Sequence, residues 1–413
     1  MNHFICIFED NKYAQLNPLS LTRPVFDLHC GMVSLKEKII RQFPDDKIGL
    51  FCRNYLKDLV EQQNPSYSVN KINTESCVFV NGRVIWDPEM MKSFSIEKEA
   101  VYFCQGQVVG AFLKEAHLTD FMTLLENESD LGSLNNIPRK EIDGVCFINY
   151  TWDLIHHNPS EIEKDFMYFK KGGRIEGEIS EHAVLTDKSN IYIGKDAVIK
   201  PGVILDADEG PIYIDQGAEI MHNAVIQGPC YIGKNSKIKI GAKIYEGTSV
   251  GEVCKVGGEV EESIIHSYSN KQHDGFLGHA YLGQWVNLGA DTNNSDLKNN
   301  YGNVKVFVNG ELIDSGSMFV GLTMGDHSKS GINTMFNTGT VAGVMCNIFG
   351  SDFLPKYIPS FSWGSARKMM EYKLDKALQT ARLVMGRRNQ EITPEYEKML
   401  KYVYDLTSSN RKS

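Results

Sequence analysis

The 413-residue sequence lacks features that several classes of protein require. Asp and Glu outnumber Lys and Arg by 52 to 43, and the net charge of -9 has the wrong sign for nonspecific binding to nucleic-acid phosphates. No apolar run approaches the roughly 20 residues that cross a bilayer. The start of the chain has a short apolar stretch followed by charges, which is typical of a first strand and not of a signal peptide. We therefore expect neither a nucleic acid nor a membrane as a partner.

The number and spacing of the cysteines argue against disulfide bonds and zinc sites. They are nine in number, scattered along the chain, and never spaced as C-x-x-C. This pattern disfavours a disulfide framework or a zinc knuckle, so we predict a reducing, cytoplasmic location. No G-x-G-x-x-G follows a predicted strand, which disfavours a Rossmann dehydrogenase.

What the sequence does contain is an internal repeat of six residues. The aliphatic positions of this repeat are Ile214, Ile220, Ile226, Ile232, Ile238, Ile244, Val250 and Val256. A small or β-branched residue follows four positions after each of them. A period of six fits neither an α-helix nor an alternating strand, but it fits short strands that turn a corner after every sixth residue. Three such sides close a coil of about 18 residues, so we predict a left-handed parallel β-helix with the aliphatic side chains inside.

The segments on either side of the repeat are different. In residues 1–160, apolar strand-like runs alternate with polar, helix-compatible stretches, which predicts an α/β domain with a largely parallel sheet. The β-helix is expected over residues 161–360. Residues 361–413 have apolar residues at helical spacing and Pro394 at a first-turn position. We predict that this helical tail covers an open end or a side of the β-helix.

Several local strings connect this layout to a known family. They are QHDGFLGHAYLGQWVNLGADTN at 272–293, NNYGNVKV at 299–306 and LNPLSLTRPVFDLHCG at 16–31. With them the chain resembles the bifunctional N-acetylglucosamine-1-phosphate uridylyltransferase/glucosamine-1-phosphate N-acetyltransferase family, as a divergent branch with a shortened first domain. The resemblance implies a nucleotidyltransferase-like first domain and an acyltransferase β-helix. It also implies acetyl-CoA as co-substrate, Mg²⁺ for nucleotidyl transfer, and a homotrimer with sites between adjacent subunits.

The family motif in the β-helix is His-x-x-Tyr-Leu-Gly, with Asn-Ile-Gly-Ala eleven positions after the tyrosine. Laid on this chain without gaps, it places the general base on His273 and a substrate contact on Asn287. Gly289 and Ala290 then lie where the pantetheine arm of acetyl-CoA would run close to the backbone. A gapped alternative places the base on His279 instead.

The residue types suit acetyl transfer. A glucosamine amine attacks a thioester only as the free base, and a histidine with an ordinary pKa of about 6.5 can take its proton. Such a base contributes roughly 10²–10⁴ in rate. By the same resemblance, the string NNYGNVK nominates Asn300 and Lys305 for the sugar phosphate.

The first domain departs from the family pattern. The glycine-rich loop that cradles a nucleoside triphosphate is replaced by FEDNKYAQLNPL, which leaves Arg23 as the phosphate-binding candidate. Arg83 stands where the family has a metal-binding carboxylate, and Asn149 lies in the second metal-ligand region. If the domain is a rebuilt enzyme, Arg23, Arg83 and Asn149 would contact substrate, and Asp10 and Asn149 would hold Mg²⁺.

Three hypotheses follow. In the first, the β-helix acetylates a hexosamine 1-phosphate from acetyl-CoA, and the first domain joins the product to a nucleotide with release of pyrophosphate. In the second, the protein is a non-catalytic partner with a degenerate first domain that binds sugar nucleotides or acts as a scaffold. In the third, only acyl transfer survives, onto a different amino sugar.

Overall fold

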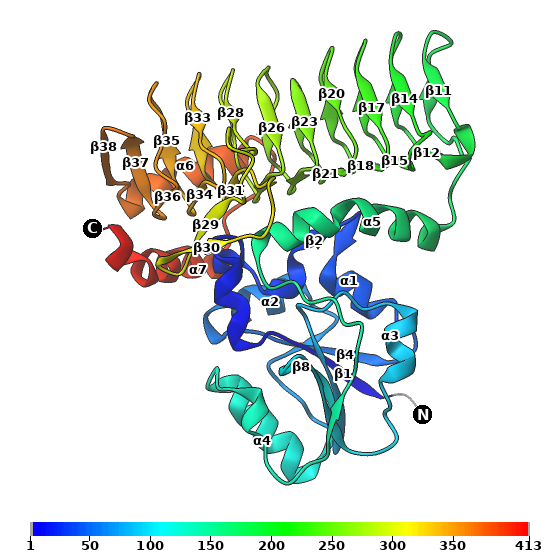
Figure 1. Ribbon diagram of the computed structural model, residues 1–413, viewed down its shortest axis with the longest axis vertical. Coiled ribbons are helices and arrows are strands. Elements are labelled where there is room, and N and C mark those ends of the chain that lie inside the picture. Colours follow the sequence, from blue (N-terminus) through cyan, green and yellow to red (C-terminus); the bar gives the residue numbers. More distant parts are fainter. Residues whose placement is uncertain (1–2, 412–413) are drawn as a thin grey trace.

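The computed structural model describes residues 3–411, which form an α/β unit and a long solenoid lying side by side (Figure 1). The last part of the chain returns from the end of the solenoid toward the α/β unit. Within residues 3–411, no helix combines the length and the apolar character needed to cross a bilayer.

The α/β unit is built on a seven-stranded sheet with the order β5-β4-β1-β6-β8-β7-β9. Neighbouring strands are parallel except where β8 pairs with β6 and β7. Apolar side chains cover both faces of its central strands, as expected for a sheet that is buried on both sides. The strands are β1 (Phe4–Phe8), β4 (Lys47–Phe51), β5 (Ser68–Val69), β6 (Ser76–Asn81), β7 (Ala100–Cys104), β8 (Gln107–Lys114) and β9 (Arg139–Glu141), beside a short hairpin of β2 (His29–Cys30) and β3 (Val33–Ser34). The helices are α1 (Leu35–Ile40), α2 (Lys57–Gln63), α3 (Pro88–Ser93) and α4 (Glu115–Glu126).

The solenoid has three walls of parallel strands, each named here for its first strand. The β10 wall contains β10 (Glu178–Ile179), β13 (Val198–Ile199), β16 (Glu219–Ile220), β19 (Lys237–Ile238), β22 (Lys255–Val256) and β25 (Asn270–Lys271), and continues through β32 (Lys329–Ser330) and β35 (Asn347–Ile348). The β11 wall contains β11 (Val184–Thr186), β14 (Ile204–Asp206), β17 (Val225–Gln227), β20 (Lys243–Ile244), β23 (Glu259–Glu261) and β26 (Phe276–Gly278), followed by β28 (Asn293–Asn294) and β33 (Met335–Phe336). The β12 wall contains β12 (Ile191–Ile193), β15 (Ile212–Ile214), β18 (Cys230–Ile232), β21 (Thr248–Val250), β24 (Ile264–Ile265), β27 (Tyr281–Leu282), β31 (Thr323–Met324), β34 (Val341–Ala342) and β36 (Tyr357–Ile358).

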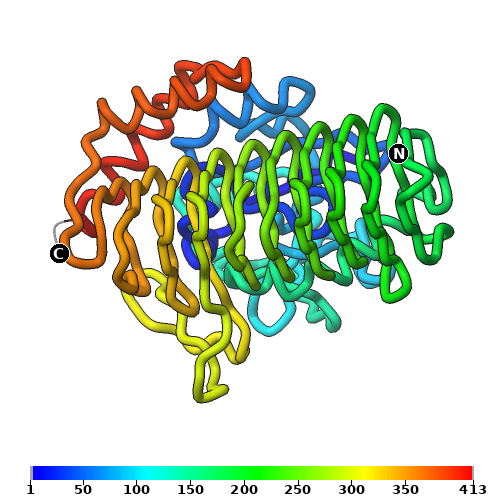
Figure 2. The backbone as a smooth tube through the Cα atoms, turned by 90° about the horizontal axis from the view of Figure 1, so that it is seen from above, coloured from blue at the N-terminus to red at the C-terminus, as the bar shows by residue number. Residues whose placement is uncertain are grey.

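The six-residue repeat places its aliphatic side chains as predicted. Ile226, Ile232 and Ile238 lie on β17, β18 and β19, which belong to the three different walls. All three side chains are buried in one cluster that runs through the interior of the solenoid. Figure 2 shows the coils stacked along the axis. The predicted fold class, an α/β domain followed by a left-handed parallel β-helix and a helical tail, is confirmed.

A long helix, α5 (Thr151–Phe169), joins the two units and lies against the β12 wall (Figure 1). Its apolar face packs on a row of wall tyrosines, with Ile162 and Phe166 in one cluster with Tyr192 and Tyr213. The boundary that we expected at residue 160 falls inside this helix. This helix is therefore an element shared by both units.

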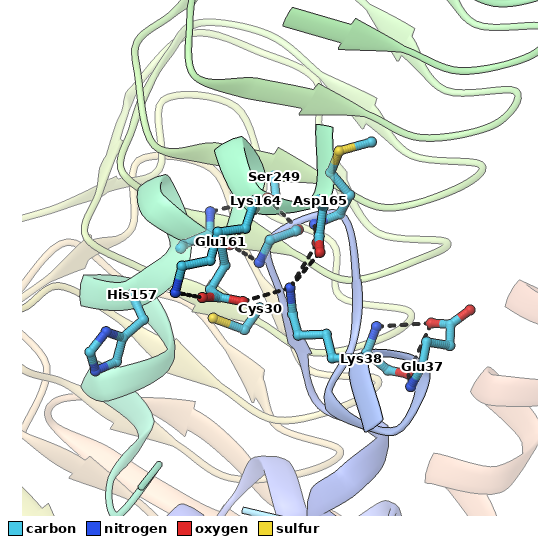
Figure 3. A network of polar contacts seen from close by, with 12 residues as sticks. Cys30, Glu37, Lys38, His157, Glu161, Lys164, Asp165 and Ser249 are labelled. Carbon is cyan, nitrogen blue, oxygen red and sulfur yellow. Dashed lines mark hydrogen bonds and ion pairs between the residues drawn. The ribbon is translucent and has the colours of Figure 1, made fainter. Parts of the chain in front are cut away.

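A buried ionic network fastens α5 to the α/β unit (Figure 3). The Lys38 ammonium on α1 lies 2.8 Å from a carboxylate oxygen of Glu161 and 2.8 Å from one of Asp165, and all three side chains are buried. Next to it, the Asn158 side chain accepts a hydrogen bond from the Gly31 amide at 2.6 Å and donates one to the Ser249 hydroxyl at 3.0 Å. Because Ser249 belongs to β21, the network binds the α/β unit, α5 and the solenoid together.

The C-terminal tail contacts a side of the β-helix, as expected, and also packs on the α/β unit. A hairpin of β37 (Ser362–Ser365) and β38 (Lys368–Glu371) extends the β10 wall, and α6 (Leu374–Gly386) and α7 (Pro394–Leu406) follow. The two predicted helices are present, but their apolar side chains, such as Leu378 and Leu400, join the core of the α/β unit. The tail therefore packs between the two units.

Candidate functional site

The α/β unit has a cavity of about 260 Å³ at the carboxyl ends of β1 and β4. This is the edge where parallel α/β sheets bind ligands. Its lining includes Glu9, Asp10, Glu126 and Glu128, and Lys57 is among the basic residues that face it. The acidic lining offers little attraction to a triphosphate.

Arg83 occupies the position between the two predicted metal ligands. Its Nε and Nη2 donate to the two carboxylate oxygens of Asp10 at 2.7 and 2.6 Å. Its Nη1 donates to the Asn149 side-chain oxygen at 3.0 Å and to the Ile148 carbonyl at 3.1 Å, and Nη2 also donates to Gln107 at 3.1 Å. All five guanidinium N–H donors thus have acceptors, and Arg83 is fully buried.

These residues do not fit a magnesium ion. Mg²⁺ prefers carboxylates and water in octahedral geometry, but the one carboxylate here is paired at both oxygens with a guanidinium. Within residues 3–411, no cluster of three or more His, Cys, Asp or Glu side chains is placed to hold a metal ion. The predicted Mg²⁺ site at Asp10 and Asn149 is therefore filled by the positive charge of Arg83.

Arg23, the predicted phosphate-binding residue, lies at the junction of the two units. Its guanidinium forms a buried ion pair with Asp326, which follows β31 of the β12 wall. Asp326 also accepts hydrogen bonds from the Thr22 hydroxyl and the Gln284 amide, both at 2.8 Å. Arg23 therefore holds the two units together. Because it is buried and its positive charge is balanced by Asp326, it has no free charge to offer a phosphate.

The two candidate histidines lie at opposite edges of the β11 wall. His273 precedes β26, at the corner between the β10 and β11 walls, and its side chain is exposed. Within residues 3–411 its ring forms no hydrogen bond, so both ring nitrogens can face a ligand. His279 follows β26, at the corner between the β11 and β12 walls, where it is buried.

His279 is held as an imidazolium. Its Nδ1 lies 2.9 Å from a carboxylate oxygen of Asp296 and its Nε2 lies 3.2 Å from one of Glu262, while Phe319 stacks on the ring. Burial alone would lower the pKa of His279, but the hydrogen bonds and charges of the two carboxylates raise it to about 9. A histidine protonated at neutral pH cannot accept a proton from an amine, so this geometry favours His273 as the base.

The walls of the solenoid are interrupted beside His273. Between β26 and β28 the side chains of Asn293 and Asn294 accept hydrogen bonds from the backbone amides of Phe276 and Gly278, at 2.8 and 3.0 Å. On the β10 wall, isolated bridges replace the regular ladder at Asn287. The coil predicted to carry the acyltransferase motif therefore departs from the regular geometry.

Asn287 shares the β10 wall with a group of cations that the sequence analysis did not single out. The Arg388 guanidinium, just beyond α6, donates to the Asn270 side chain at 3.0 Å, and Asn270 donates to Asn287 at 3.3 Å. Burial and the neighbouring cations, chiefly Arg388 and Lys239, lower the pKa of Lys255 on the same wall. Within residues 3–411, Lys239, Lys255 and Arg388 form no ion pair with a carboxylate. We call these three residues the cationic face.

The other predicted residues lie elsewhere or have structural roles. Lys305 begins β29 (Lys305–Val308), which pairs with β30 (Glu311–Asp314) in a loop that projects from the solenoid (Figure 2). The next residue, Val306, packs against Trp152 of α5, so Lys305 lies toward the β12 wall and not beside His273. Asn300 is exposed in the same loop. The structure therefore does not bring Asn300 and Lys305 to His273.

Gly289 is small because adjacent coils touch there. A β-carbon on Gly289 would lie 2.4 Å from the Gly331 backbone of the next coil. Ala290 lies at the same corner, and its carbonyl accepts the Asn333 amide at 2.8 Å. The close approach of the coils explains Gly289 without a ligand, and the roles of Gly289 and Ala290 toward pantetheine stay predictions.

The fold and these groups define the class: a nucleotidyltransferase-like α/β unit fused to a hexapeptide β-helix. Residues 5–174 match the family model described as sugar nucleotidyl transferase. The chain is 23% identical over 314 residues to the bifunctional protein GlmU of Bartonella quintana, covering 70% of this chain and 63% of that protein. It is 32% identical over 233 residues to GlmU of Jannaschia sp., covering 51% and 50% respectively. The chain thus resembles the bifunctional protein GlmU, and it spans less than two thirds of the length of these relatives.

Among solved structures, the UDP-N-acetylglucosamine acyltransferase from Campylobacter jejuni is 15% identical to this chain. The match covers 55% of this chain and 95% of that one, with a TM-score of 0.25. The likeness is too slight to bear on function.

Proposed function

We propose that this protein is a transferase of sugar-nucleotide biosynthesis whose β-helix moves the acetyl group of acetyl-CoA onto the amine of a hexosamine 1-phosphate. The observation that carries the proposal is the exposed His273, on the coil next to Asn287 and on the same side of the solenoid as the cationic face. Both substrates are phosphorylated, so unpaired cations beside a free imidazole suit them. The resemblance to GlmU supports the same process.

In the proposed reaction the free amine attacks the thioester carbonyl, and the His273 imidazole accepts the amine proton. The tetrahedral intermediate then expels coenzyme A as its thiolate, which takes up a proton. Lys255 and Arg388 balance the phosphate charge of the substrates, and Asn287 orients the sugar. The residues needed are a base and cations, since no covalent enzyme intermediate is formed.

The expected result for the wild-type protein is release of free thiol from acetyl-CoA that depends on glucosamine 1-phosphate. The measurement is a colorimetric thiol assay, beside a control without the sugar. Thiol release that does not need an amino sugar, or no release with several hexosamine 1-phosphates, would contradict the proposal.

We further propose a homotrimer that works in the cytoplasm. The β12 wall is covered by the α/β unit, α5 and the tail, so the other two walls remain for copies of the chain. Ile240 and Ile332, at the corner between those walls, are 63% and 70% exposed. All nine cysteines are free thiols, as a reducing compartment would leave them.

The geometry of Arg83 favours a second candidate function, in which the α/β unit binds a sugar nucleotide without transferring a nucleotidyl group. Nucleotidyl transfer uses divalent cations to neutralise developing charge, and a buried guanidinium with every donor engaged cannot exchange for one. The unit would then sense the sugar nucleotide and not convert it.

Binding to this unit is therefore expected to be independent of Mg²⁺. Calorimetric titration with UDP-N-acetylglucosamine should give the same Kd in EDTA and in millimolar Mg²⁺, and UTP with N-acetylglucosamine 1-phosphate should release no pyrophosphate. Pyrophosphate release that requires Mg²⁺ would show that this unit is an active nucleotidyltransferase.

A further inference from the structure

One interior position of the β-helix carries a lysine where the repeat calls for an aliphatic residue. The inward-facing column of the β10 wall runs through Ile220, Ile238 and Val256, and Lys271 is the next residue in register. Lys271 is 2% exposed. An ammonium group in an aliphatic column destabilises the fold unless it is well paired, so packing does not explain its presence.

The ammonium of Lys271 reaches from this column to the corner that carries His273. It donates to the His273 carbonyl at 2.6 Å, the one hydrogen bond that it forms within residues 3–411. A β-carbon on Gly258 would lie 2.8 Å from the same nitrogen, so the amine fills the space left by that glycine. Lys271 therefore fixes the backbone of the corner from within the solenoid.

The charges that face Lys271 come from its own corner and from the next coil. Burial lowers the pKa of Lys271 to about 8, while Asp274 and Asp291 raise it in part. Neither carboxylate forms an ion pair with Lys271 within residues 3–411. The group therefore loses its proton near pH 8, well below the pH at which an exposed lysine does.

We propose that Lys271 is a positioning residue for acetyl transfer, and that its protonated amine holds the backbone of the His273 corner so that the imidazole meets the acceptor amine. This inference rests on the proposed function of the β-helix. A catalytic group that is misplaced by about 1 Å can lose up to about 10²-fold in rate. The benefit of holding the His273 backbone in place can therefore outweigh the cost of burying the Lys271 charge. Deprotonation removes the charge that strengthens the hydrogen bond to the His273 carbonyl, so the rate should decline above about pH 8.

The test replaces Lys271 by methionine, with Lys271→Ile as a second variant that matches the column. We expect kcat to fall about 10- to 100-fold with KM within about twofold, since the substrates bind to other groups. The decline of the rate above pH 8 should disappear, and Tm should stay the same or rise because an apolar side chain fits the interior. The matched control is Lys237→Met, which removes an exposed lysine paired with Glu219 on the same wall and should leave kcat unchanged.

The outcomes separate this inference from the function on which it rests. Wild-type kcat and an unchanged pH profile in both Lys271 variants would overturn the inference and leave acetyl transfer standing. A lower Tm in both variants would make Lys271 a structural residue and would also overturn it. Absence of thiol release from the wild-type protein would overturn acetyl transfer itself, and the inference with it.

Discussion

Replacing His273 by alanine is expected to lower the rate of acetyl transfer by about 10²–10⁴-fold, the usual contribution of a general base. The loss should appear in kcat, because the imidazole acts on the proton that leaves the amine during attack. His273 is exposed and its ring forms no hydrogen bond within residues 3–411, so the free energy of unfolding should change little. Thiol release and urea unfolding measure the two effects.

His222 provides a matched control for this experiment. It is an exposed histidine two positions after Ile220 on the β10 wall, just as His273 follows Lys271. His222→Ala should therefore keep wild-type kcat. Equal losses in the two variants would show that the corner tolerates no change and that His273 has no special role.

His279→Ala tests the alternative base. Because the pKa of His279 is raised to about 9 in the folded protein, its pairing with Asp296 and Glu262 stabilises the fold fully below pH 6.5. This contribution is lost as the pH rises through 9. We expect the variant to lose stability at neutral pH but to keep most of its kcat. Loss of activity in this variant alone would assign the base to His279.

Replacing Lys38 by methionine is expected to reduce the free energy of unfolding by up to about 3–5 kcal/mol, because it removes the buried cation that Glu161 and Asp165 share and leaves each with one partner, Lys164 or Arg41. Lys38 contacts Glu161 and Asp165 at 2.8 Å, and all three side chains are buried. Urea unfolding at neutral pH measures the loss.

Lys164 offers the matched control for Lys38. Its ammonium lies 2.7 Å from the other carboxylate oxygen of Glu161, but its side chain is 47% exposed. Lys164→Met should therefore cost at most about 1 kcal/mol. A loss as large as that of Lys38→Met would contradict the distinction between buried and exposed pairs.

The pH dependence gives a second measurement of the same network. Burial raises the pKa of Glu161, but Lys38 and Lys164 more than offset this, so the pKa lies below its ordinary value of 4.5. In the Lys38→Met protein the Glu161 carboxylate can take up a proton more easily, so the difference from wild type should shrink as the pH falls below about 5. A difference that stays constant down to pH 4 would argue against an electrostatic origin.

The β-helix could be predicted because its signal is local and repeated. Ile226, Ile232 and Ile238 each point into the solenoid from a different wall, so each six-residue period corresponds to one side of a coil. The place of the tail was less predictable: Leu378 and Leu400 have helical spacing, but spacing does not say which unit they cover. The expected domain boundary near residue 160 falls within α5, because this helix packs on both units.

The candidate site was predicted in part. The motif placed His273 and Asn287 on neighbouring coils, but their roles stay predictions. The sequence showed that Arg83 stands in place of a carboxylate, yet its pairing with Asp10 depends on β1 and β6 lying side by side. Lys271 could not be found in this way, because it lies 15 residues after Val256 and so outside the six-residue series, and only the strand pairing places it in the interior column.

The buried ions around Lys38 have a consequence for how material moves between the two halves. A hinge motion between the two units would separate Lys38 from Glu161 and Asp165 and break the hydrogen bond between Asn158 and Ser249. Because these buried contacts resist such a motion, the two units keep a fixed distance from each other. No swinging arm can then carry a sugar from the corner at His273 to the cavity beside Asp10. Anything made at one must diffuse through the surrounding liquid to reach the other.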